Sequence, residues 1–214
     1  MARDQRELSA AEKRRLANFN LISEELLEQR YRKTDLTCSV VKANTDGILY
    51  GLLVSIPFIV IYVLLNMKQL KQVFHGIDSF FSRFAVFWII LLILIVIHEL
   101  IHGITWSRFT QNGFKDIEFG VIWKMLTPYC TCKEPLKKVP YILGTAMPCI
   151  VLGILPCIIS WFTHSGWLLG IGVLMILSAG GDLLIITMIL KNKASESALY
   201  LDHPTEVGLI VFEK

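Results

Sequence analysis

Apolar and polar stretches alternate along the chain, and four apolar runs are long enough to cross a bilayer as helices, which takes about 20 residues. They span residues 48–66, 84–106, 139–163 and 167–190. The first 46 residues are polar and contain no apolar stretch typical of a cleavable signal peptide, so the first run is expected to be a retained anchor. The pattern predicts a multi-pass membrane protein.

Shorter patterns predict a small sheet outside the membrane. Residues 114–123 end in β-branched and aromatic side chains, and residues 125–136 could return beside them as the second strand of a hairpin. An ordinary loop on the bilayer surface is the alternative, because short strand patterns are ambiguous. Residues 35–41 and 207–212 are two further candidate strands.

The N-terminal segment carries a helix signal. Ser9 and Glu12 have capping-box spacing, so an amphipathic helix is expected from about Ala10 towards Arg32. Together the patterns predict an all-α membrane protein, with four transmembrane helices and a small cytoplasmic β-hairpin or sheet element. Its expected parts are a cytoplasmic N-terminal helical segment, a four-helix membrane core and a cytoplasmic tail, at residues 1–46, 47–191 and 192–214.

The distribution of basic residues predicts the orientation in the membrane. Lys137 and Lys138 precede the third run, and Lys191 and Lys193 follow the fourth, whereas the turn at residues 163–166 has no Lys or Arg. The positive-inside rule places that turn outside and both termini in the cytoplasm. The same reasoning makes one loop cytoplasmic and another external, at residues 107–138 and 67–83.

Composition supports a lipid bilayer as the partner and excludes two other classes. Apolar residues make up 54% of the chain and the mean hydropathy is +0.55. The net charge of +3 is too small to indicate a nucleic-acid partner. Five scattered cysteines, an odd number, do not form the framework of a secreted disulfide-rich protein, so reduced thiols are expected.

The second apolar run contains the strongest chemical signal, His98-Glu99-Leu100-Ile101-His102. Residues four apart share one face of a helix, so the two imidazoles can bind one metal while Glu99 serves as a base for an activated water. A charged group at the bilayer centre costs about 2.5 to 3.5 kcal/mol, so three ionisable residues in one turn need a shared purpose. The motif predicts a membrane-embedded zinc hydrolase.

Asp182 is the expected third ligand. His98 lies fourteen residues after Phe84, and Asp182 lies fourteen residues after Leu168, so both should sit at a similar depth in helices that run the same way. A hydrolytic zinc site uses three protein ligands and keeps a fourth position for water. Iron and manganese also accept imidazole and carboxylate ligands. The predicted cofactor is Zn²⁺.

Other potential ligands fit this site less well. His75 and His164 are expected on the external side and His203 in the C-terminal tail, where each is interpreted as a surface histidine. Cys130 and Cys132 lack the second cysteine pair that a structural zinc site requires.

Small residues and prolines predict local features of the third and fourth runs. Gly180 and Gly181 remove side-chain bulk and should allow another helix to approach closely. Pro148 and Pro156 delete backbone donors and should bend their helix. Aromatic residues near the ends of the runs are interpreted as interfacial belts, although packing is the alternative: Tyr50, Trp88, Trp106, Tyr141, Trp161 and Trp167.

The chain also resembles a known family in its motifs. These are His98-Glu99-Leu100-Ile101-His102-Gly103, Tyr129-Cys130, Lys133-Glu134-Pro135-Leu136 and Ser178-Ala179-Gly180-Gly181-Asp182. Over about residues 35 to 212 the chain is similar to small bacterial membrane proteins described as putative zincin peptidases, distantly resembling site-2 intramembrane metalloproteases. The resemblance implies a multi-pass protein of the bacterial cell membrane. It also implies metal binding by His98, His102 and Asp182 and catalysis by Glu99, although the flanking order Gly181-Asp182-Leu183 differs from the Leu-Asp-Gly of site-2 enzymes.

Three functions are compatible with these observations. The preferred one is a zinc metalloprotease that hydrolyses membrane-protein or peptide substrates in or next to the bilayer. The second is a non-proteolytic membrane zinc hydrolase, and the third is a non-enzymatic metal-binding or transport protein. Residues 85–97 offer only Trp88 as a polar group, which favours an enclosed site over a conduit.

Overall fold

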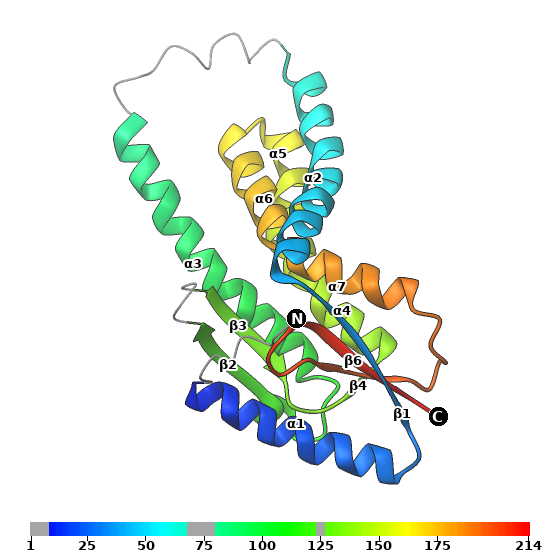
Figure 1. The fold of residues 1–214 in the computed structure, drawn as a ribbon. Helices are drawn as coiled ribbons and strands as arrows, with labels where there is room; N and C mark the ends of the chain where they lie inside the picture. Colours follow the sequence, from blue (N-terminus) through cyan, green and yellow to red (C-terminus); the bar gives the residue numbers. More distant parts are fainter. Residues whose placement is uncertain (1–8, 68–79, 123–126) are drawn as a thin grey trace.

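A computed structural model describes residues 9–67, 80–122 and 127–214 of the chain. The predicted external loop falls mainly on residues 68–79, which lie outside the described residues together with His75. The described part is mostly helical. Figure 1 shows long helices at one end and a layer of strands, covered by a further helix, at the other.

Long apolar helices form the upper part of the molecule in Figure 1. Within the described residues three are long and apolar enough to cross a membrane: Val40–Leu65, Val86–Trp106 and Lys138–Thr163. The first is α2 (Val40–Leu65) and the second belongs to α3 (Phe80–Trp106). The third is a continuous path through α4 (Lys138–Pro148), η3 (Cys149–Ile154) and α5 (Leu155–Thr163).

The fourth predicted helix is not one straight element. It is a pair, α6 (Gly166–Ser178) and α7 (Gly180–Lys191), bent by 50° at Ala179. The pair reaches the length of a membrane span only when both helices are counted together. The unbroken run that hydropathy predicts at residues 167–190 is therefore corrected to two helices meeting at an angle.

Proline explains the irregular third span. η3 is a π-helix that lies between Pro148 at the end of α4 and Pro156 at the start of α5. Proline has no backbone N–H and its ring pushes away the carbonyl of the preceding turn, so the regular bonding pattern cannot continue through both positions. The structure shows a wider turn between the two prolines.

Glycine allows α7 to pack closely against α2. A Cβ added at Gly180 would lie 2.5 Å from the carbonyl oxygen of Gly47, which is a backbone atom that cannot rotate away. The absence of both side chains therefore brings the two backbones into contact. The close approach expected at Gly180 is confirmed, and its partner is α2.

The strands form two antiparallel sheets below the helices. The larger has the order β1-β6-β5-β4, with bounds Arg32–Cys38, Val207–Glu213, Leu199–Asp202 and Leu136–Lys137. The smaller is the hairpin of β2 (Ile117–Ile122) and β3 (Thr127–Cys132), in which Phe119 pairs with Cys130. A short 3₁₀ helix, η2 (Gly113–Asp116), leads into this hairpin. The predicted combination of long helices and a small β element is thus confirmed as a mostly helical fold with small antiparallel sheets.

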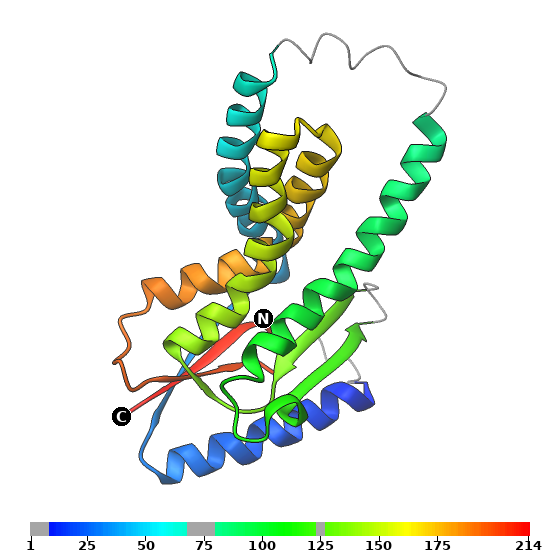
Figure 2. The same ribbon diagram turned by 180° about the vertical axis from the view of Figure 1, so that it is seen from behind.

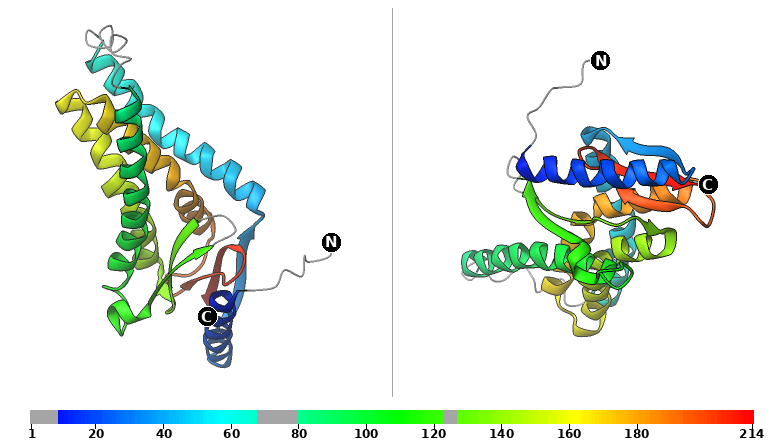
Figure 3. Two further views of the ribbon diagram at one scale, coloured as in Figure 1. Left: turned by 90° about the vertical axis from the view of Figure 1, so that its left-hand side faces the viewer. Right: turned by 90° about the horizontal axis from the view of Figure 1, so that it is seen from below.

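Strand β6 is the centre of the lower layer. Leu209 and Val211 join the core formed with the helices above, whereas Ile210 and Phe212 join the core formed with helix α1 (Ala10–Glu28). Figure 3 shows from below that α1 lies across the sheet. Because both faces of β6 are buried, its sequence is a continuous apolar run and does not alternate. The predicted capping box of Ser9 and Glu12 is present at the start of α1.

Helices α3, α4 and α7 come together at the level where the helices meet the sheets. Figure 2 shows α4 running between α3 and α7 at this level. Trp106, at the end of α3, and Tyr141, on α4, are only 4% and 2% exposed and pack against each other. The interpretation of these two side chains as interfacial belts is wrong, and the packing alternative holds for them. Trp88 and Trp167 are about half exposed.

Candidate metal centre

Helix α3 presents His98 and His102 one turn apart on its buried face. Both side chains are almost fully buried, and their ring centroids lie 4.9 Å apart. Asp182 comes from the first turn of α7, just after the bend at Ala179. His98 Nε2 lies 3.1 Å from Asp182 Oδ2, and His102 Nε2 lies 3.4 Å from Oδ1 of the same carboxylate. The structure therefore brings the three predicted ligands together from two distant segments.

The spacing between the Asp182 carboxylate and each histidine suits a tetrahedral ion. One ligand atom from each of the three residues lies within 4.8 Å of the others. Zinc–nitrogen and zinc–oxygen bonds of about 2.0 to 2.1 Å in tetrahedral geometry separate neighbouring ligand atoms by about 3.3 Å. The distances of 3.1 and 3.4 Å agree with that separation. The donor set, two imidazoles and one carboxylate, is also one that zinc accepts.

The hydrogen bonding of His102 adds a chemical argument for a cation. Its Nδ1 lies 2.9 Å from the carbonyl oxygen of Gly144, and a carbonyl can only accept, so Nδ1 carries a proton. In a neutral imidazole Nε2 is then an acceptor, and it faces the carboxylate of Asp182. Two facing acceptors require a proton or a cation between them. A metal ion satisfies both at once.

Packing fixes the plane of the His102 ring. Trp106 stacks on it with ring centroids 5.1 Å apart and an angle of 17° between the planes. The indole N–H of Trp106 donates to the carbonyl of Tyr141 on α4. A side chain at Gly144 would overlap the indole, so only glycine leaves room for the stack. The second turn of α4 therefore both orients His102 and fixes its tautomer.

His98 is held differently. Its Nδ1 is buried, and no hydrogen-bond partner for it occurs among the described residues. The position of its ring is set by the helix, by the neighbouring His102 and by the carboxylate of Asp182. The two histidines of the motif thus differ in the hydrogen bonds that their Nδ1 atoms make.

Glu99 lies next to this cluster and lines the same cavity. Its side chain is half-buried, and the backbone amide of Cys130 on β3 lies close to its carboxylate. The cavity has a volume of about 390 Å³ and is bounded by α3, β3, α4, α7 and the start of β6. The predicted base therefore reaches a space that a substrate can enter, beside the three candidate ligands.

Asp202 is the third acidic residue of this cavity, beside Glu99 and Asp182, and no motif in the sequence marks it. It ends β5, and its carboxylate accepts hydrogen bonds from Tyr141 and, at 2.6 Å, from Thr131. Burial raises the pKa of Asp202, and these two hydrogen bonds oppose that effect. The only signal in the sequence was a polar Asp202-His203-Pro204 turn, which does not reveal that the turn folds back under β3.

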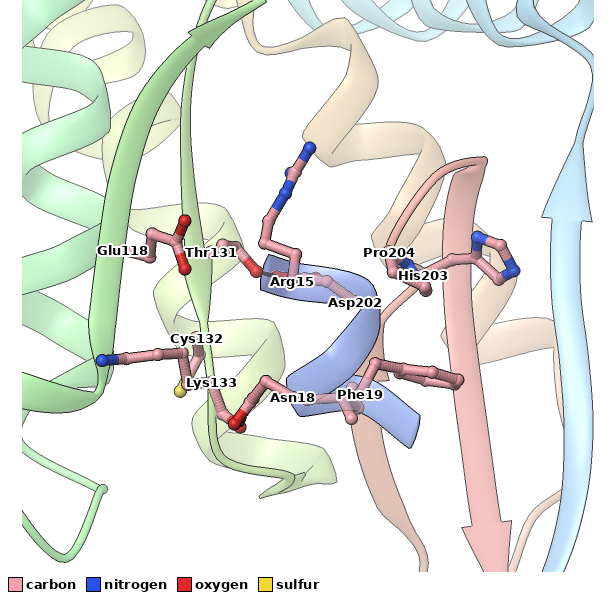
Figure 4. Close-up of a pocket in the computed structure, with 11 residues that line it drawn as sticks. Arg15, Asn18, Phe19, Glu118, Thr131, Cys132, Lys133, Asp202, His203 and Pro204 are labelled. Carbon is pink, nitrogen blue, oxygen red and sulfur yellow. Dashed lines mark hydrogen bonds between the residues drawn. The ribbon is translucent and has the colours of Figure 1, made fainter. Parts of the chain in front are cut away.

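A much smaller pocket adjoins the cavity on the side of α1. Figure 4 shows it between α1, β3 and the turn after β5, with Asn18, Lys133 and His203 among its lining residues. Arg15, Thr131 and Asp202 line both spaces. Its volume of about 30 Å³ leaves no room for a substrate, so the larger cavity is the relevant one.

The competing ligands do not join the cluster. Cys130 lines the same cavity and Cys132 is buried on the same strand, but within the described residues the group of potential ligand atoms consists of His98, His102 and Asp182. Burial raises the pKa of both thiols. His164 follows α5 and accepts a hydrogen bond from Tyr62 near the end of α2 through its carbonyl. His203 Nδ1 accepts from the amides of Thr205 and Glu206 in the turn before β6.

A scan against protein-family models matches the part of the chain that contains the cluster. Residues 91–196 match the model of a family described as "Putative zincin peptidase". The resemblance predicted from the motifs is thereby confirmed for this part of the chain. The zincin-peptidase match begins in α3 before His98 and ends beyond α7, so it includes all three candidate ligands and Glu99. Searches of curated proteins and of solved structures found no match.

Proposed function

We propose that this protein is a zinc-dependent peptidase that hydrolyses peptide bonds of membrane-protein or peptide substrates in or next to the bilayer. One observation carries the proposal: His98, His102 and Asp182 place their ligand atoms within 4.8 Å of one another beside a cavity that Glu99 also lines. The zincin-peptidase family match supports the reaction class. The long apolar helices support the membrane.

In this proposal His98, His102 and Asp182 hold the metal and Glu99 moves the proton. A zinc ion held there would act as a Lewis acid and lower the pKa of a water to about 7. Glu99 accepts a proton from the attacking water, whose oxygen bonds to the peptide carbonyl carbon. Glu99 then delivers that proton to the amide nitrogen as the C–N bond breaks, so one water yields a carboxylic acid and an amine.

We further propose that β3 binds the substrate as an extended chain. Residues Pro128, Tyr129, Cys130 and Thr131 of this strand line the cavity. Strand β3 has one partner, β2, within the described sheets. A peptide bond inside a helix is hidden by its own hydrogen bonds, so a substrate helix must unwind, and a strand edge can replace the lost main-chain bonds.

The proposal places the protein in the bacterial cell membrane as a multi-pass protein with both termini in the cytoplasm. The basic residues that flank the third and fourth apolar runs support this orientation. The hairpin of β2 and β3, and with it the cavity, would then open towards the cytoplasm.

Metal analysis and one conservative substitution test the function. Purified protein is expected to contain about one zinc per chain by mass spectrometry of the metal, since the three ligands form a single site. Glu99→Gln should keep this zinc but reduce peptide hydrolysis at least about 100-fold, because general-base catalysis typically contributes that much. Glu196→Gln, at an exposed position after α7, is the matched control and should change neither quantity.

The contrary results are specific. Full hydrolysis by the Glu99→Gln variant would exclude this residue as the base. Bound zinc without hydrolysis of any peptide would favour the non-proteolytic hydrolase or the metal-binding and transport alternative. Protein that takes up no zinc would overturn the proposal altogether.

A further inference from the structure

A cation from the N-terminal helix enters the cavity of the candidate metal centre. Arg15 belongs to α1, which packs below the sheet and outside the long apolar helices. Figure 4 shows its guanidinium group pointing away from Asn18 and Phe19 of the same helix. Arg15 lines the cavity that also contains His98, Glu99 and Asp182. A segment outside the family match thus contributes a side chain to the site.

The hairpin holds this guanidinium group in place. Arg15 Cζ lies 4.2 Å from the centre of the Tyr129 ring, a cation–π contact with β3. Tyr129 pairs with Gly120 of β2, where an added Cβ would overlap the tyrosine ring. Because Gly120 has no side chain, the ring can lie against β2 and support Arg15. The cation is therefore positioned by three elements and not left free in solvent.

The guanidinium group has unused hydrogen-bonding capacity. Its Nε is buried without a hydrogen-bond partner, and no ion pair of Arg15 occurs among the described residues. Two of the nearby acids are engaged, since Asp202 accepts from Thr131 and Tyr141 and Asp182 faces the two histidines. Glu99 and Glu118 also line the two spaces, and among the described residues neither forms an ion pair with Arg15. A buried N–H group without an acceptor is costly. An anionic ligand entering the cavity would remove that cost.

We propose that Arg15 binds a carboxylate of the substrate and so selects peptides that carry one close to the bond that is cleaved. The guanidinium fork matches a carboxylate with two parallel hydrogen bonds. The cavity of about 390 Å³ is near the lower end of the ~300 to 1,000 Å³ range of ligand sites, so only a short stretch of chain fits between Arg15 and the metal centre. This inference rests on the proposed peptidase function. The carboxylate is a free C-terminus or the side chain of Asp or Glu.

Three matched peptides distinguish the two sources of the carboxylate. They share one sequence and end in a free carboxylate, in an amide, or in an amide with an added Glu as the last residue. The wild-type protein should hydrolyse a carboxylate-bearing peptide with a kcat/KM about 10- to 100-fold above that of the plain amide, the range expected for a charge-assisted hydrogen bond. A preference for the first peptide alone identifies the C-terminus, and a preference that includes the third identifies an acidic side chain.

Variants of Arg15 then test the residue itself. Arg15→Gln should bring the carboxylate and amide peptides to similar kcat/KM values, with most of the change in KM, and Arg15→Lys should restore part of the preference. Arg14→Gln, at an exposed position of the same helix, should leave the preference intact. An equal loss for both peptides in Arg15→Gln would overturn the proposal, because a purely structural role affects all substrates alike. A wild-type protein that does not distinguish the peptides would also overturn it.

Binding separates a failure of this inference from a failure of the proposed function. In the Glu99→Gln background the dissociation constants of the free and amidated peptides are measured directly, without turnover. If the peptide with the free carboxylate binds more tightly and Arg15→Gln abolishes this difference, the contact between Arg15 and the carboxylate is supported, even if the wild-type protein hydrolyses no peptide. If the two peptides bind equally and the wild-type protein hydrolyses them, the contact between Arg15 and the carboxylate is rejected and the peptidase function remains.

Discussion

Two histidines on one helical turn have different outer partners. His102 donates from Nδ1 to Gly144 and is stacked by Trp106, whereas the buried Nδ1 of His98 has no partner among the described residues. Outer partners fix the tautomer and orientation of metal-binding imidazoles, and their loss typically weakens binding. The affinity of the site should therefore depend strongly on α4, although α4 contributes none of the proposed ligands.

Gly144→Ala tests this dependence. The added methyl group would overlap the indole of Trp106, displace it from His102 and disturb the bond to the Gly144 carbonyl. Zinc affinity, measured by competition with a chelator, is expected to fall about 10- to 100-fold. Gly170→Ala on α6 is the control, because a Cβ there would meet only ordinary contact at 3.9 Å. Unchanged affinity in Gly144→Ala would show that the carbonyl and the stack do not position the ligand.

The protonation of Cys132 gives a test that does not involve the metal. Burial raises its pKa to about 12, whereas an unperturbed thiol has a pKa of about 8.5. Only the thiolate reacts with alkylating agents, so at pH 8 the folded protein should be modified about a thousandfold more slowly than the unfolded chain. The alkylation rate of Cys132 in the folded protein should keep rising as the pH is increased towards 12. Mass spectrometry of iodoacetamide-treated protein measures it, and equal rates in folded and unfolded protein would contradict the burial.

Some of these residues could be predicted from the sequence, for a physical reason. His98, Glu99 and His102 are recognisable because helical geometry alone brings residues four apart together. Asp182 followed from the cost of placing an acid in an apolar run. Gly144 acts through its backbone carbonyl, and Asp202 acts through hydrogen bonds that form only after folding. Neither role can be recognised from the neighbouring residues in the sequence.

The bend between α6 and α7 was also beyond prediction from hydropathy. The run stays apolar through Ala179, and mean hydropathy contains no information on the direction of a helix axis. The sequence indicates close packing at Gly180 and Gly181, and the contact of Gly180 with α2 confirms it for the first of them. The strands of the hairpin and β6 were predicted within a few residues, because β-branched and apolar runs mark them. The pairing of β6 with β1 joins segments too distant for any local pattern to indicate.

Neighbouring glycines in α7 provide a matched pair of substitutions. Gly180→Ala places a methyl group against the backbone of Gly47, so α2 and α7 must separate, at a cost of about 1 to 3 kcal/mol. Gly181→Ala meets nothing within 4 Å and should be neutral or stabilise the helix by up to about 1 kcal/mol. Thermal unfolding in detergent compares the two variants. Equal stability would mean that the α2–α7 contact does not limit the fold.

The larger sheet fixes the sidedness of the whole molecule. Strand β1, before the first apolar helix, pairs with β6 at the end of the chain, from Arg32 with Glu213 to Cys38 with Val207. In the proposed membrane topology both segments must therefore lie on one side of the bilayer. The turn between α5 and α6 lies at the opposite end of the helices in Figure 1.

Epitope tags on membrane vesicles check this arrangement. Tags at the N-terminus and at the C-terminus should be digested together or protected together when protease is added to vesicles of one orientation. A tag inserted after His164, between α5 and α6, should show the opposite behaviour. The positive-inside rule further predicts that the termini are protected in right-side-out vesicles. Opposite results for the two termini would be incompatible with the pairing of β1 and β6.

That pairing also affects how the protein is made. A ribosome releases the chain from the N-terminal end, so α3 with its two histidines can enter the lipid while the last strand is still being translated. Strand β1 must wait for β6, and Val207 and Gly208 of β6 form part of the cavity wall. Until β6 has been synthesised, the cavity lacks this wall. The complete cavity that the proposed function requires can therefore form only after β6 has left the ribosome.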